Sequence, residues 1–393
     1  MGMVLEGIKV IDISQYFAGP GTAMYLADLG ADVIKVEPLA GDSCRTLHTT
    51  PRLGPLSKPF LVLNRNKRSI ALDLRKPKAR EVVYRLLDKA DVFIHNFVVG
   101  DDVKFDMDYP TLSKRNPRLV YAHVTAYGTT GPYAKMPGYD IAIQARMGIT
   151  GARRMPDGTP VSSPVLVADM SAPMLLSFGI TAALLDRHRT GKGRLVETSL
   201  LDLIVAMQGY TLVKVEGDDP TLPGSQANVQ YSPYRCADDE WLVVAFITDQ
   251  KWTQLCEVMD LAHLATDPAY DNYMKRLAAS AEIGAVLQEI FATKSRDEWI
   301  KLLEAAEVPC CPVNDREDVF DDPQVRATEA IISYDHPIAG RVWFMNTPLQ
   351  ISGQERRVRL PAPLVGEHTD AILKETGYAA TEIAALRKEK AIA

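Results

Sequence analysis

Short apolar runs alternate with helical segments along the N-terminal third of the chain, and this alternation constrains the fold more than any other feature of the sequence. The first unit is a predicted strand at residues 8–14, a helix at residues 21–29 that Gly30 ends, and a second strand at Asp32–Glu37. Further strands are predicted at residues 69–74, 91–97 and 118–127, and further helices at residues 77–89 and 109–115. Because repeated strand-helix-strand units build a parallel sheet covered by helices, the sequence predicts a doubly wound, Rossmann-like α/β domain.

In sheets of this kind, sites form at the carboxyl ends of the strands. The segments there are residues 15–21, Glu37, residues 96–97 and residues 127–128. The glycines at positions 19 and 21 and the acid at position 37 invite comparison with a dinucleotide-binding motif. However, the glycine order is not G-x-G-x-x-G, and Pro20 removes a backbone N–H that a pyrophosphate would use. A nicotinamide or flavin enzyme is therefore disfavoured.

A second pattern centres on Asp169. Residues 165–168 form an apolar run that predicts a short buried strand, and residues 174–188 carry apolar side chains at helical spacing. We therefore expect Asp169 at a strand-to-helix junction, where the positive end of the helix dipole favours the ionised carboxylate and prepares it as a nucleophile or base. The alternative is that Asp169 or Ser171 only caps a helix that Pro173 opens.

The chain changes character after residue 215. A strand at residues 194–199 and a helix at residues 200–215 are followed by residues 216–227, an acidic stretch rich in glycine and proline that is typical of a linker. Residues 228–328 are predicted to form a smaller α+β domain, with a strand at 241–246, helices at 252–259, 280–293 and 295–306, and a segment at 308–313 too rich in proline for a central strand. Residues 329–393, with a strand at 342–346 and helices at 368–376 and 381–390, are expected to return to the large domain of residues 1–215.

The composition indicates a large globular protein and excludes several classes. The 393 residues are 47% hydrophobic, which suffices for large cores, and the net charge of -6 gives no basic surface for nucleic acid. The longest apolar run, residues 172–185, is shorter than the ~18 residues of a membrane-spanning helix, so we expect no membrane association and a cytoplasmic location. Five cysteines, of which only Cys310 and Cys311 are close in sequence, provide neither a disulfide framework nor a metal-binding spacing.

Motifs along nearly the whole chain resemble those of one known family. They are LEGIKVID at residues 5–12, AGP at 18–20, LGADVIKVE at 29–37, NKRSIALDL at 66–74, NF at 96–97, NPRLVY at 116–121, GYD at 138–140, TGKG at 190–193 and GEHT at 366–369. In this order they are similar to the class III CoA-transferases, the family of formyl-CoA and carnitine CoA-transferases. The resemblance implies an enzyme that moves CoA from an acyl-CoA to a carboxylic acid, with Asp169 as the catalytic aspartate. It also implies a CoA thioester as co-substrate, and neither a prosthetic group nor a metal.

Two groups of binding residues are expected, and the resemblance implies the first of them. Those near the CoA moiety are Lys67, Arg68, Leu72, Asn96, Phe97 and Lys104. The basic members suit the CoA phosphates, and the apolar ones suit its adenine. We expect Tyr16, Phe17, His48, Tyr139 and Met147 to line a substrate pocket larger than a formyl group needs, so a branched, unsaturated or dicarboxylic acyl group would fit, and no residue selects among these. Phe17 and Pro38 stand where the formyl-CoA enzymes place a polar and a basic residue, which argues against formyl and oxalate as substrates.

The chemistry that this assignment implies is covalent acyl transfer. The Asp169 carboxylate attacks the thioester to give a mixed anhydride, the CoA thiolate returns to give an aspartyl-CoA thioester, and the acceptor acid takes the CoA. We expect backbone N–H groups of residues 19–21, or the Tyr139 hydroxyl, to stabilise the oxyanions.

Two other functions stay open. By the resemblance, α-methylacyl-CoA racemases share this fold and use a His-Asp pair as base, where this chain has Tyr139 before Asp140. A phenol with a pKa of about 10 is a poor base at neutral pH. The other function is CoA binding without turnover, against which the presence of Asp169 argues.

The resemblance also implies a homodimer in which each chain passes through the other. The connections available for such interlocking are the linker at residues 216–227, a second crossing at 315–328, and the terminal segment at 368–390 if it packs on the large domain. The partners expected from the sequence are therefore an acyl-CoA, a carboxylic acid and a second copy of the chain.

Overall fold

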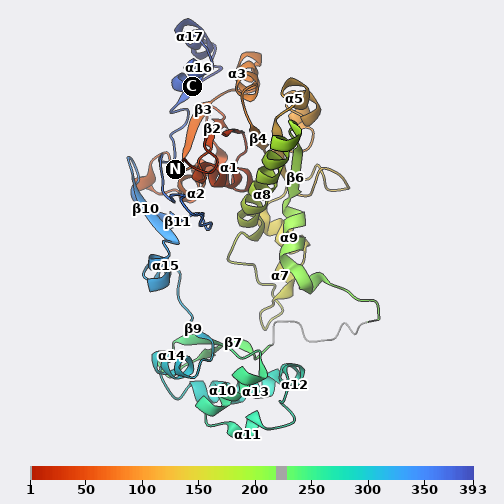
Figure 1. Ribbon diagram of the computed structural model, residues 1–393, viewed down its shortest axis with the longest axis vertical. Coiled ribbons are helices and arrows are strands. Elements are labelled where there is room, and N and C mark those ends of the chain that lie inside the picture. The colour runs from red at the N-terminus through yellow and green to blue at the C-terminus, as the bar shows by residue number, and fades with distance from the viewer. Residues whose placement is uncertain (1, 218–227) are drawn as a thin grey trace. The chain divides into compact units, whose positions relative to one another are not determined.

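The computed structural model describes residues 2–217 and 228–393, and the chain divides into two compact units (Figure 1). The larger unit is Met1–Val213 with Ala327–Ala393, and the smaller unit is Lys214–Arg326. The linker predicted at residues 216–227 lies, from residue 218 onward, outside the described residues. The two ends of the chain thus belong to one unit, although the other unit separates them in sequence.

A six-stranded parallel sheet forms the centre of the larger unit. Its strands, in spatial order, are β3 (Lys67–Ala71), β2 (Asp32–Glu37), β1 (Lys9–Asp12), β4 (Val92–His95), β5 (Val120–Thr125) and β6 (Leu195–Ser199). The order reverses between β1 and β4, as in other doubly wound sheets. The predicted Rossmann-like α/β architecture is confirmed.

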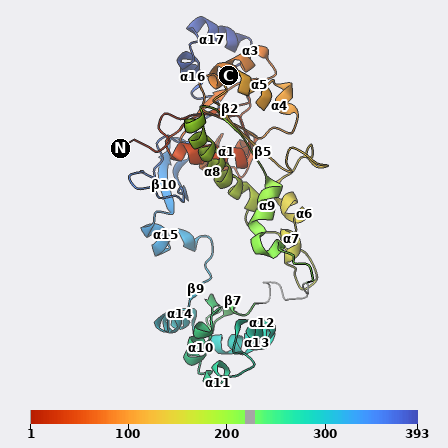
Figure 2. The same cartoon turned by 45° about the vertical axis from the view of Figure 1, so that its right-hand side comes forward.

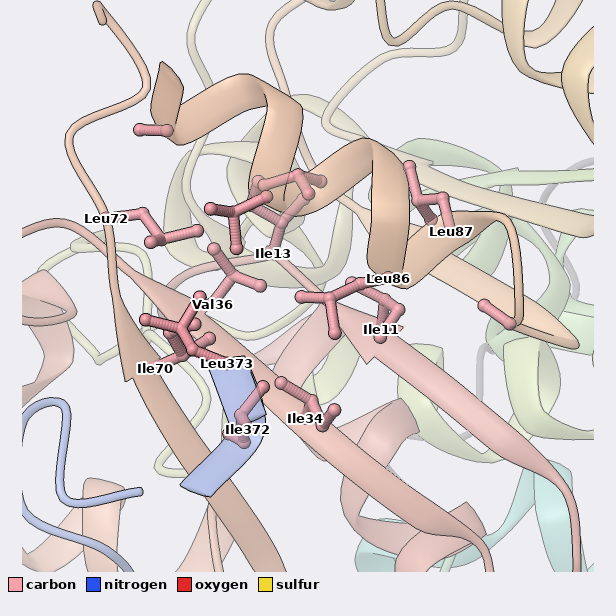
Figure 3. Close-up of a cluster of buried hydrophobic side chains, with 14 of the residues drawn as sticks. Ile11, Ile13, Ile34, Val36, Ile70, Leu72, Leu86, Leu87, Ile372 and Leu373 are labelled. Atoms are coloured by element: carbon pink, nitrogen blue, oxygen red, sulfur yellow. The ribbon is translucent and has the colours of Figure 1, made fainter. Parts of the chain in front are cut away.

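The strands divide their side chains between two apolar layers, because successive residues of a strand point to opposite faces of the sheet. On β1, Ile11 joins one buried cluster with Leu86, and Val10 joins the other with Leu26. Figure 3 shows the first cluster, in which residues 86–87 and 372–373, from two different helices, surround side chains from the strands. Both faces of the sheet are therefore covered.

Helices of the larger unit supply these layers. The first layer includes α3 (Pro77–Leu87), α5 (Tyr109–Arg115), α16 (Thr369–Glu375) and α17 (Ala380–Lys388), and the second includes α1 (Ala18–Asp28), α8 (Val167–Thr190) and α9 (Leu200–Gln208). The remaining elements are α2 (Lys58–Leu63), α4 (Asp101–Lys104), α6 (Asp140–Arg146), α7 (Ile149–Ala152) and the antiparallel hairpin of β10 (Ile331–His336) and β11 (Gly340–Met345). Figure 2 shows α16 and α17 beside α3, and α1 beside α8.

The start of α8 differs from the prediction. The strand expected at residues 165–168 does not form, and Pro173, expected to open the helix, lies inside it. The buried carboxylate of Asp140 accepts the backbone N–H groups of Ala168 at 2.6 Å and Asp169 at 3.0 Å, so a residue distant in sequence caps the helix. Asp169 therefore lies in the first turn of α8 and not at a strand-to-helix junction. Periodicity alone cannot distinguish a short apolar strand from the start of a buried helix, which explains the error.

Helix α8 is the one helix within residues 2–217 and 228–393 that is long and apolar enough to cross a membrane. Leu176 and Ile180 are buried in the second apolar layer, and Arg187 near the end of the helix pairs with Asp91 at 2.9 Å. One side of α8 therefore packs in the larger unit, whereas Phe178 and Leu185 on this helix are 71% and 73% exposed.

The predicted helix at residues 200–215 is shorter in the structure. Helix α9 ends at Gln208, and a 3-10 turn at Gly209–Leu212 follows. Gly209 has a positive φ of 50°, a conformation that glycine adopts readily and that ends the helix.

The C-terminal segment packs beside β3 at the edge of the sheet. His368 donates its backbone N–H to Ser69 O at 2.9 Å, and Asp73 donates its backbone N–H to Ala391 O at 3.0 Å. Ile372 of α16 adds to the first apolar layer. The end of the chain is therefore an integral part of the larger unit.

Within the smaller unit, a three-stranded antiparallel sheet packs with helices around its own core. Its elements are β7 (Tyr231–Arg235), β8 (Trp241–Ala245), α10 (Asp249–Val258), α11 (Ala262–Ala265), α12 (Tyr273–Ala278), α13 (Ser280–Phe291), α14 (Arg296–Ala305), β9 (Cys310–Pro312) and, at the boundary, α15 (Pro323–Ala327). The proline-containing β9 lies at the edge of the sheet, where a missing N–H donor is tolerated. The predicted α+β character of this unit is confirmed.

Candidate active site

The carboxyl ends of β1 and β4 meet at the point where the strand order reverses. The Asn96 side chain, directly after β4, joins the two ends, because its Oδ1 accepts the backbone N–H of Gln15 at 3.0 Å and its Nδ2 donates to Gln15 O at 2.8 Å. Ligands of doubly wound sheets bind at such a reversal. The pair of Asn96 and Gln15 therefore fixes the backbone at the expected position of the site.

Three hollows lie in this region, and we name each after one lining residue. The aspartate hollow, of about 560 Å³, is lined by residues that include Tyr16, Phe17, Asn96, Phe97, Tyr139 and Asp169. The leucine hollow, of about 420 Å³, is lined by residues that include Leu72, Arg75, Phe97 and Phe105. The lysine hollow, of about 530 Å³, is lined by residues that include Phe17, His48, Lys58 and Met170. The aspartate hollow shares Phe97 with the leucine hollow and Phe17 with the lysine hollow. It therefore adjoins both of the other hollows and lies between them.

Asp169 lines the aspartate hollow beside a second acid. Burial raises the pKa of Asp169 to about 7, and the negative charge of Asp140 adds to this rise. We expected the helix end to favour the ionised form, but the Asp140 carboxylate occupies the amides of Ala168 and Asp169 at that end. Asp169 is therefore divided between its ionised and protonated forms near neutral pH, which suits a group that takes part in chemistry.

Two buried histidines, His95 at the end of β4 and His123 within β5, hold the backbone of Phe97. His95 Nδ1 accepts the Phe97 N–H at 3.3 Å, and His123 Nε2 forms a hydrogen bond with Phe97 O at 3.0 Å. The two imidazole rings stack with centroids 4.1 Å apart. Burial, with a smaller effect of His123, keeps the pKa of His95 well below its usual range, so His95 is neutral and can accept the N–H. The residue shared by two hollows is thus fixed on both sides of its peptide backbone.

Two tyrosines of the aspartate hollow contact each other edge to face. The ring centroids of Tyr16 and Tyr139 are 6.1 Å apart, and the rings are inclined by 81°. Tyr16 has a φ of 68°, which is unfavourable for a residue other than glycine, and its backbone N–H donates to Asp42 Oδ1 at 3.1 Å. Tyr139 is 64% exposed, so its hydroxyl is accessible to a ligand.

The first turn of α1 also borders the aspartate hollow, through Ala18. A Cβ on Gly21 would come within 2.6 Å of Pro173, so this glycine allows α1 and α8 to approach closely. The Gly21 N–H donates to Phe17 O at 2.8 Å and is not available to a ligand. The amides of Ala18 and Gly19 precede the first intrahelical hydrogen bond and have no intrahelical acceptor.

Lys67 and Arg68, predicted near CoA, lie outside the three hollows. The ammonium of Lys67 is fully buried and donates to Asp12 Oδ2 at 2.9 Å, Pro20 O at 2.8 Å and Asn64 Oδ1 at 3.0 Å. Arg68 forms ion pairs with two carboxylates, each at 2.8 Å. Because an ammonium has three donors, Lys67 has none left for a phosphate. We therefore exclude Lys67 from the candidate site. We also leave Arg68 out, because it lines none of the three hollows.

Lys104 and Met147 also lie outside the hollows. Lys104 is exposed and pairs with Asp101 at 2.5 Å, but it precedes Phe105 of the leucine hollow in sequence. Met147 packs against the second apolar layer, and its carbonyl accepts the Gln208 side chain at 2.8 Å. The predicted residues that do line the hollows are Asp169, Tyr16, Phe17, His48, Tyr139, Leu72, Asn96 and Phe97.

Asp140, Lys58 and Arg75 are among the lining residues of the hollows that were not predicted as site residues. Asp140 was visible only as the last residue of the GYD motif, and no local pattern relates it to the amides of a helix much later in the chain. Lys58 and Arg75 are two of 44 basic residues, and no local pattern distinguishes either from the others. The described part of the chain contains no group of three or more His, Cys, Asp or Glu that could hold a metal ion.

Comparisons with known proteins show the family of the chain. Residues 5–369 match the family described as CoA-transferase family III. The chain is 32% identical over 375 residues to succinyl-CoA:glutarate CoA-transferase of Homo sapiens, with 94% of this chain and 85% of that protein covered. It is 30% identical over 419 residues to formyl-CoA:oxalate CoA-transferase of Escherichia coli, with 100% of both covered. A solved CaiB/BaiF family protein from Brucella suis superposes with a TM-score of 0.81 at 32% identity, over 96% of this chain and 100% of that one.

Proposed function

Because the chain belongs to CoA-transferase family III, it transfers coenzyme A between an acyl-CoA and a carboxylic acid, and we propose that Asp169 is the nucleophile of this transfer. The observation that carries the proposal is the position of Asp169 in the hollow between two others, with a pKa of about 7. A nucleophilic carboxylate needs to be accessible and ionised, and Asp169 meets both conditions at and above neutral pH.

The transfer proceeds in four steps. An Asp169 oxygen attacks the thioester carbonyl of the donor, the C–S bond breaks, and CoA leaves as a thiolate from a mixed anhydride of Asp169 and the acyl group. The thiolate attacks the Asp169 carbonyl and releases the donor acid as a carboxylate, which leaves Asp169 as a CoA thioester. The acceptor carboxylate attacks that thioester and gives a second mixed anhydride and thiolate. The thiolate then attacks the acceptor carbonyl, which releases the new acyl-CoA and the free Asp169 carboxylate, with no net proton transfer.

The leucine hollow is the proposed position of the nucleotide end of CoA. Its apolar lining suits an adenine, and Phe97 separates it from the aspartate hollow where the thioester reacts. Arg75, whose side chain is 86% exposed and pairs with Asp73 at 2.8 Å, provides a positive charge for phosphate groups at the edge of this hollow, and Lys104 near Phe105, paired with Asp101, provides another. Arg75 of the leucine hollow and Lys104 beside it are thus proposed for the role that the resemblance implied for Lys67 and Arg68.

Each tetrahedral intermediate places a negative charge on an oxygen that needs donors. The first-turn amides of Ala18 and Gly19 are the proposed donors from the backbone, because they have no intrahelical acceptor and stand at the positive end of α1. The Tyr139 hydroxyl is the proposed donor from a side chain, since it lines the same hollow and is exposed.

The proposed assembly is a homodimer of interlocked chains, located in the cytoplasm. Met174, Phe178 and Leu185 of α8 are 50%, 71% and 73% exposed, and they form an apolar surface that a second chain would cover. The proposed location in the cytoplasm is supported by the five cysteines, which are all free thiols, as expected in a reducing compartment.

The interlocked assembly can be tested by dilution. Interlocked chains cannot separate without unfolding, so dilution should give no folded monomer. A compact monomer in light scattering at nanomolar concentration would contradict interlocking but leave the chemistry of Asp169 unaffected.

The experiment that tests the function is an exchange assay. The enzyme is incubated with a panel of acyl-CoA donors and free carboxylic acids, and new thioesters are identified by mass spectrometry. The same mixtures in deuterated water separate transferase from racemase, because a transferase forms new thioesters without deuterium uptake at the α-carbon of a 2-methylacyl-CoA. Enzyme-dependent deuterium uptake without new thioesters would contradict the proposal.

A further inference from the structure

The proposed mechanism uses the aspartate and leucine hollows and leaves the lysine hollow without a role. The lysine hollow shares Phe17 with the aspartate hollow, and Met170, the residue after Asp169 in α8, also lines it. CoA enters the aspartate hollow from the side of Phe97 in our proposal. The acyl group of the thioester then extends away from CoA. It points toward Phe17, on the side of the aspartate hollow that adjoins the lysine hollow.

The lining of the lysine hollow combines an apolar wall with a polar end. Its apolar members include Val62, Leu63 and Met170, which suit the methylene groups of an acyl chain. Its polar members include His48, Thr50 and Lys58. A ligand that fits both parts has a short hydrocarbon chain and a negatively charged end.

Lys58 is the cation of this hollow and has no acidic partner of its own. Among residues 2–217 and 228–393, no carboxylate forms an ion pair with its ammonium. The backbone before it is fixed, because the buried Ser57 hydroxyl accepts the Phe60 N–H at 3.1 Å and donates to Cys44 O at 2.7 Å. The charge is therefore available to a ligand and comes from an anchored segment.

The aspartate hollow offers the opposite environment. Its described lining contains no lysine or arginine, and it contains the acids Asp140 and Asp169. A second carboxylate on the acyl group would be repelled there, whereas Lys58 attracts it in the lysine hollow. The two hollows together favour one direction for a diacid, with its reacting end at Asp169 and its far end at Lys58.

We propose that the lysine hollow is the subsite for the far carboxylate of a dicarboxylic acyl group, with Lys58 as its anchoring cation. This inference rests on the proposed function, since it takes Asp169 as the group that the reacting carbonyl meets. Donor and acceptor acids use the same subsite in turn, because both pass through an anhydride on Asp169. Lys58 acts on specificity and takes no part in bond making or breaking.

The test compares diacids with monoacids of equal chain length. Succinyl-CoA and butanoyl-CoA serve as donors and glutarate and pentanoate as acceptors, and the measured quantities are the two ratios of kcat/KM, diacid over monoacid. Wild-type enzyme should give ratios above one. Lys58→Met should lower both ratios by about 10- to 100-fold, the effect expected for loss of a hydrogen-bonded charge pair. Lys58→Arg should restore most of the preference, and Lys114→Met, at an exposed lysine outside the hollows, should leave it unchanged.

Each result decides for or against the subsite. A wild-type preference for the monoacids, ratios that Lys58→Met leaves unchanged, or an equal fall for diacids and monoacids would overturn it. Failure of the proposed function looks different, because a dispensable Asp169 would show as transfer by an Asp169→Asn variant with both classes of acid.

Discussion

Asp12 is a fully buried acid of the larger unit and Asp169 a partly buried one, and their neighbours differ in charge. Asp12, the last residue of β1, is 0% exposed, with Lys67 at 2.9 Å and Lys35 at 4.0 Å. Burial alone would raise the pKa of Asp12, but the two ammonium groups lower it below its ordinary value. Asp169 has Asp140 as its charged neighbour, and its pKa rises to about 7.

The difference separates a structural charge from a functional one. The charge of Asp12 is balanced in the folded state, and removal of a partner would leave an uncompensated charge in the interior. The charge of Asp169 is unbalanced, so the protein holds a carboxylate in an unfavourable state at a position open to a ligand. Unbalanced titratable groups in a hollow are typical of active sites. Variants of the two regions should therefore fail in different ways, the first in stability and the second in activity.

Asp169→Asn has the largest expected effect. Loss of the nucleophile should lower the rate of transfer at least about 1,000-fold, or about 4 kcal/mol in activation free energy, while CoA binding and folding persist. The rate is measured by thioester exchange and CoA binding by calorimetry. Asp157→Asn in an exposed loop is the control and should stay within about twofold of wild type. Transfer by the Asp169 variant at more than about a thousandth of the wild-type rate would show that Asp169 is not the nucleophile.

Lys35→Met has the second largest effect and acts on stability. Lys35 Nζ donates to Asp42 Oδ2 at 2.8 Å and also to Ser14 O, and both side chains of the pair are fully buried. We expect a loss of about 3 kcal/mol in the free energy of unfolding in urea. Arg357→Met, at an exposed pair with Glu355, should cost less than about 0.5 kcal/mol. Equal losses in the two variants would show that the buried ion pair of Lys35 and Asp42 contributes no more to the free energy of unfolding than an exposed pair does.

Asp140→Asn should change the pH dependence of the reaction. In wild type, kcat/KM should fall below about pH 7, because protonated Asp169 is not a nucleophile. Removal of the Asp140 charge should move this acid limb to lower pH by up to about one unit. Asp108→Asn, at a carboxylate that caps α5 by accepting the Thr111 N–H at 3.0 Å, should leave the limb in place. A limb that does not move would mean that Asp140 does not act on the charge of Asp169.

The smallest expected effect is on stability as a function of pH. Because the folded pKa of Asp169 is raised, the contribution of this group to stability is fully present below about pH 4 and is lost as the pH rises to about 7. Asp169→Asn removes this loss, so the variant should gain stability relative to wild type between pH 5 and pH 8, by about 1 kcal/mol or more. Urea unfolding of wild type and variant at pH 5 and at pH 8 measures this difference in stability. For Asp12 the sign is reversed, since a lowered pKa stabilises above about pH 4 and the stabilisation is lost as the pH falls.

The sequence predicted the alternating part of the fold well, because each strand of the parallel sheet is a short apolar run with its own turn signals. It misplaced the start of α8, since the group that caps this helix, Asp140, belongs to a different segment. The same limit applies to charge. The motif containing Lys67 suggested a phosphate contact, but whether a lysine is free or buried against Asp12 depends on strand pairing and on contacts between distant residues. Short motifs therefore identify the family of a site more readily than the neighbours that set its charge.

The central claim is that Asp169 becomes covalently linked to CoA during transfer, and mass spectrometry of the enzyme tests it most directly. The enzyme is mixed with a donor acyl-CoA without acceptor, quenched in acid and digested with trypsin. The peptide of residues 155–187 then contains the aspartates Asp157, Asp169 and Asp186 and no glutamate. We predict a CoA thioester on this peptide, with fragment ions that place it on Asp169, and its disappearance when an acceptor acid is added before the quench. An adduct on another residue, or an enzyme that turns over without any adduct on this peptide, would contradict the account.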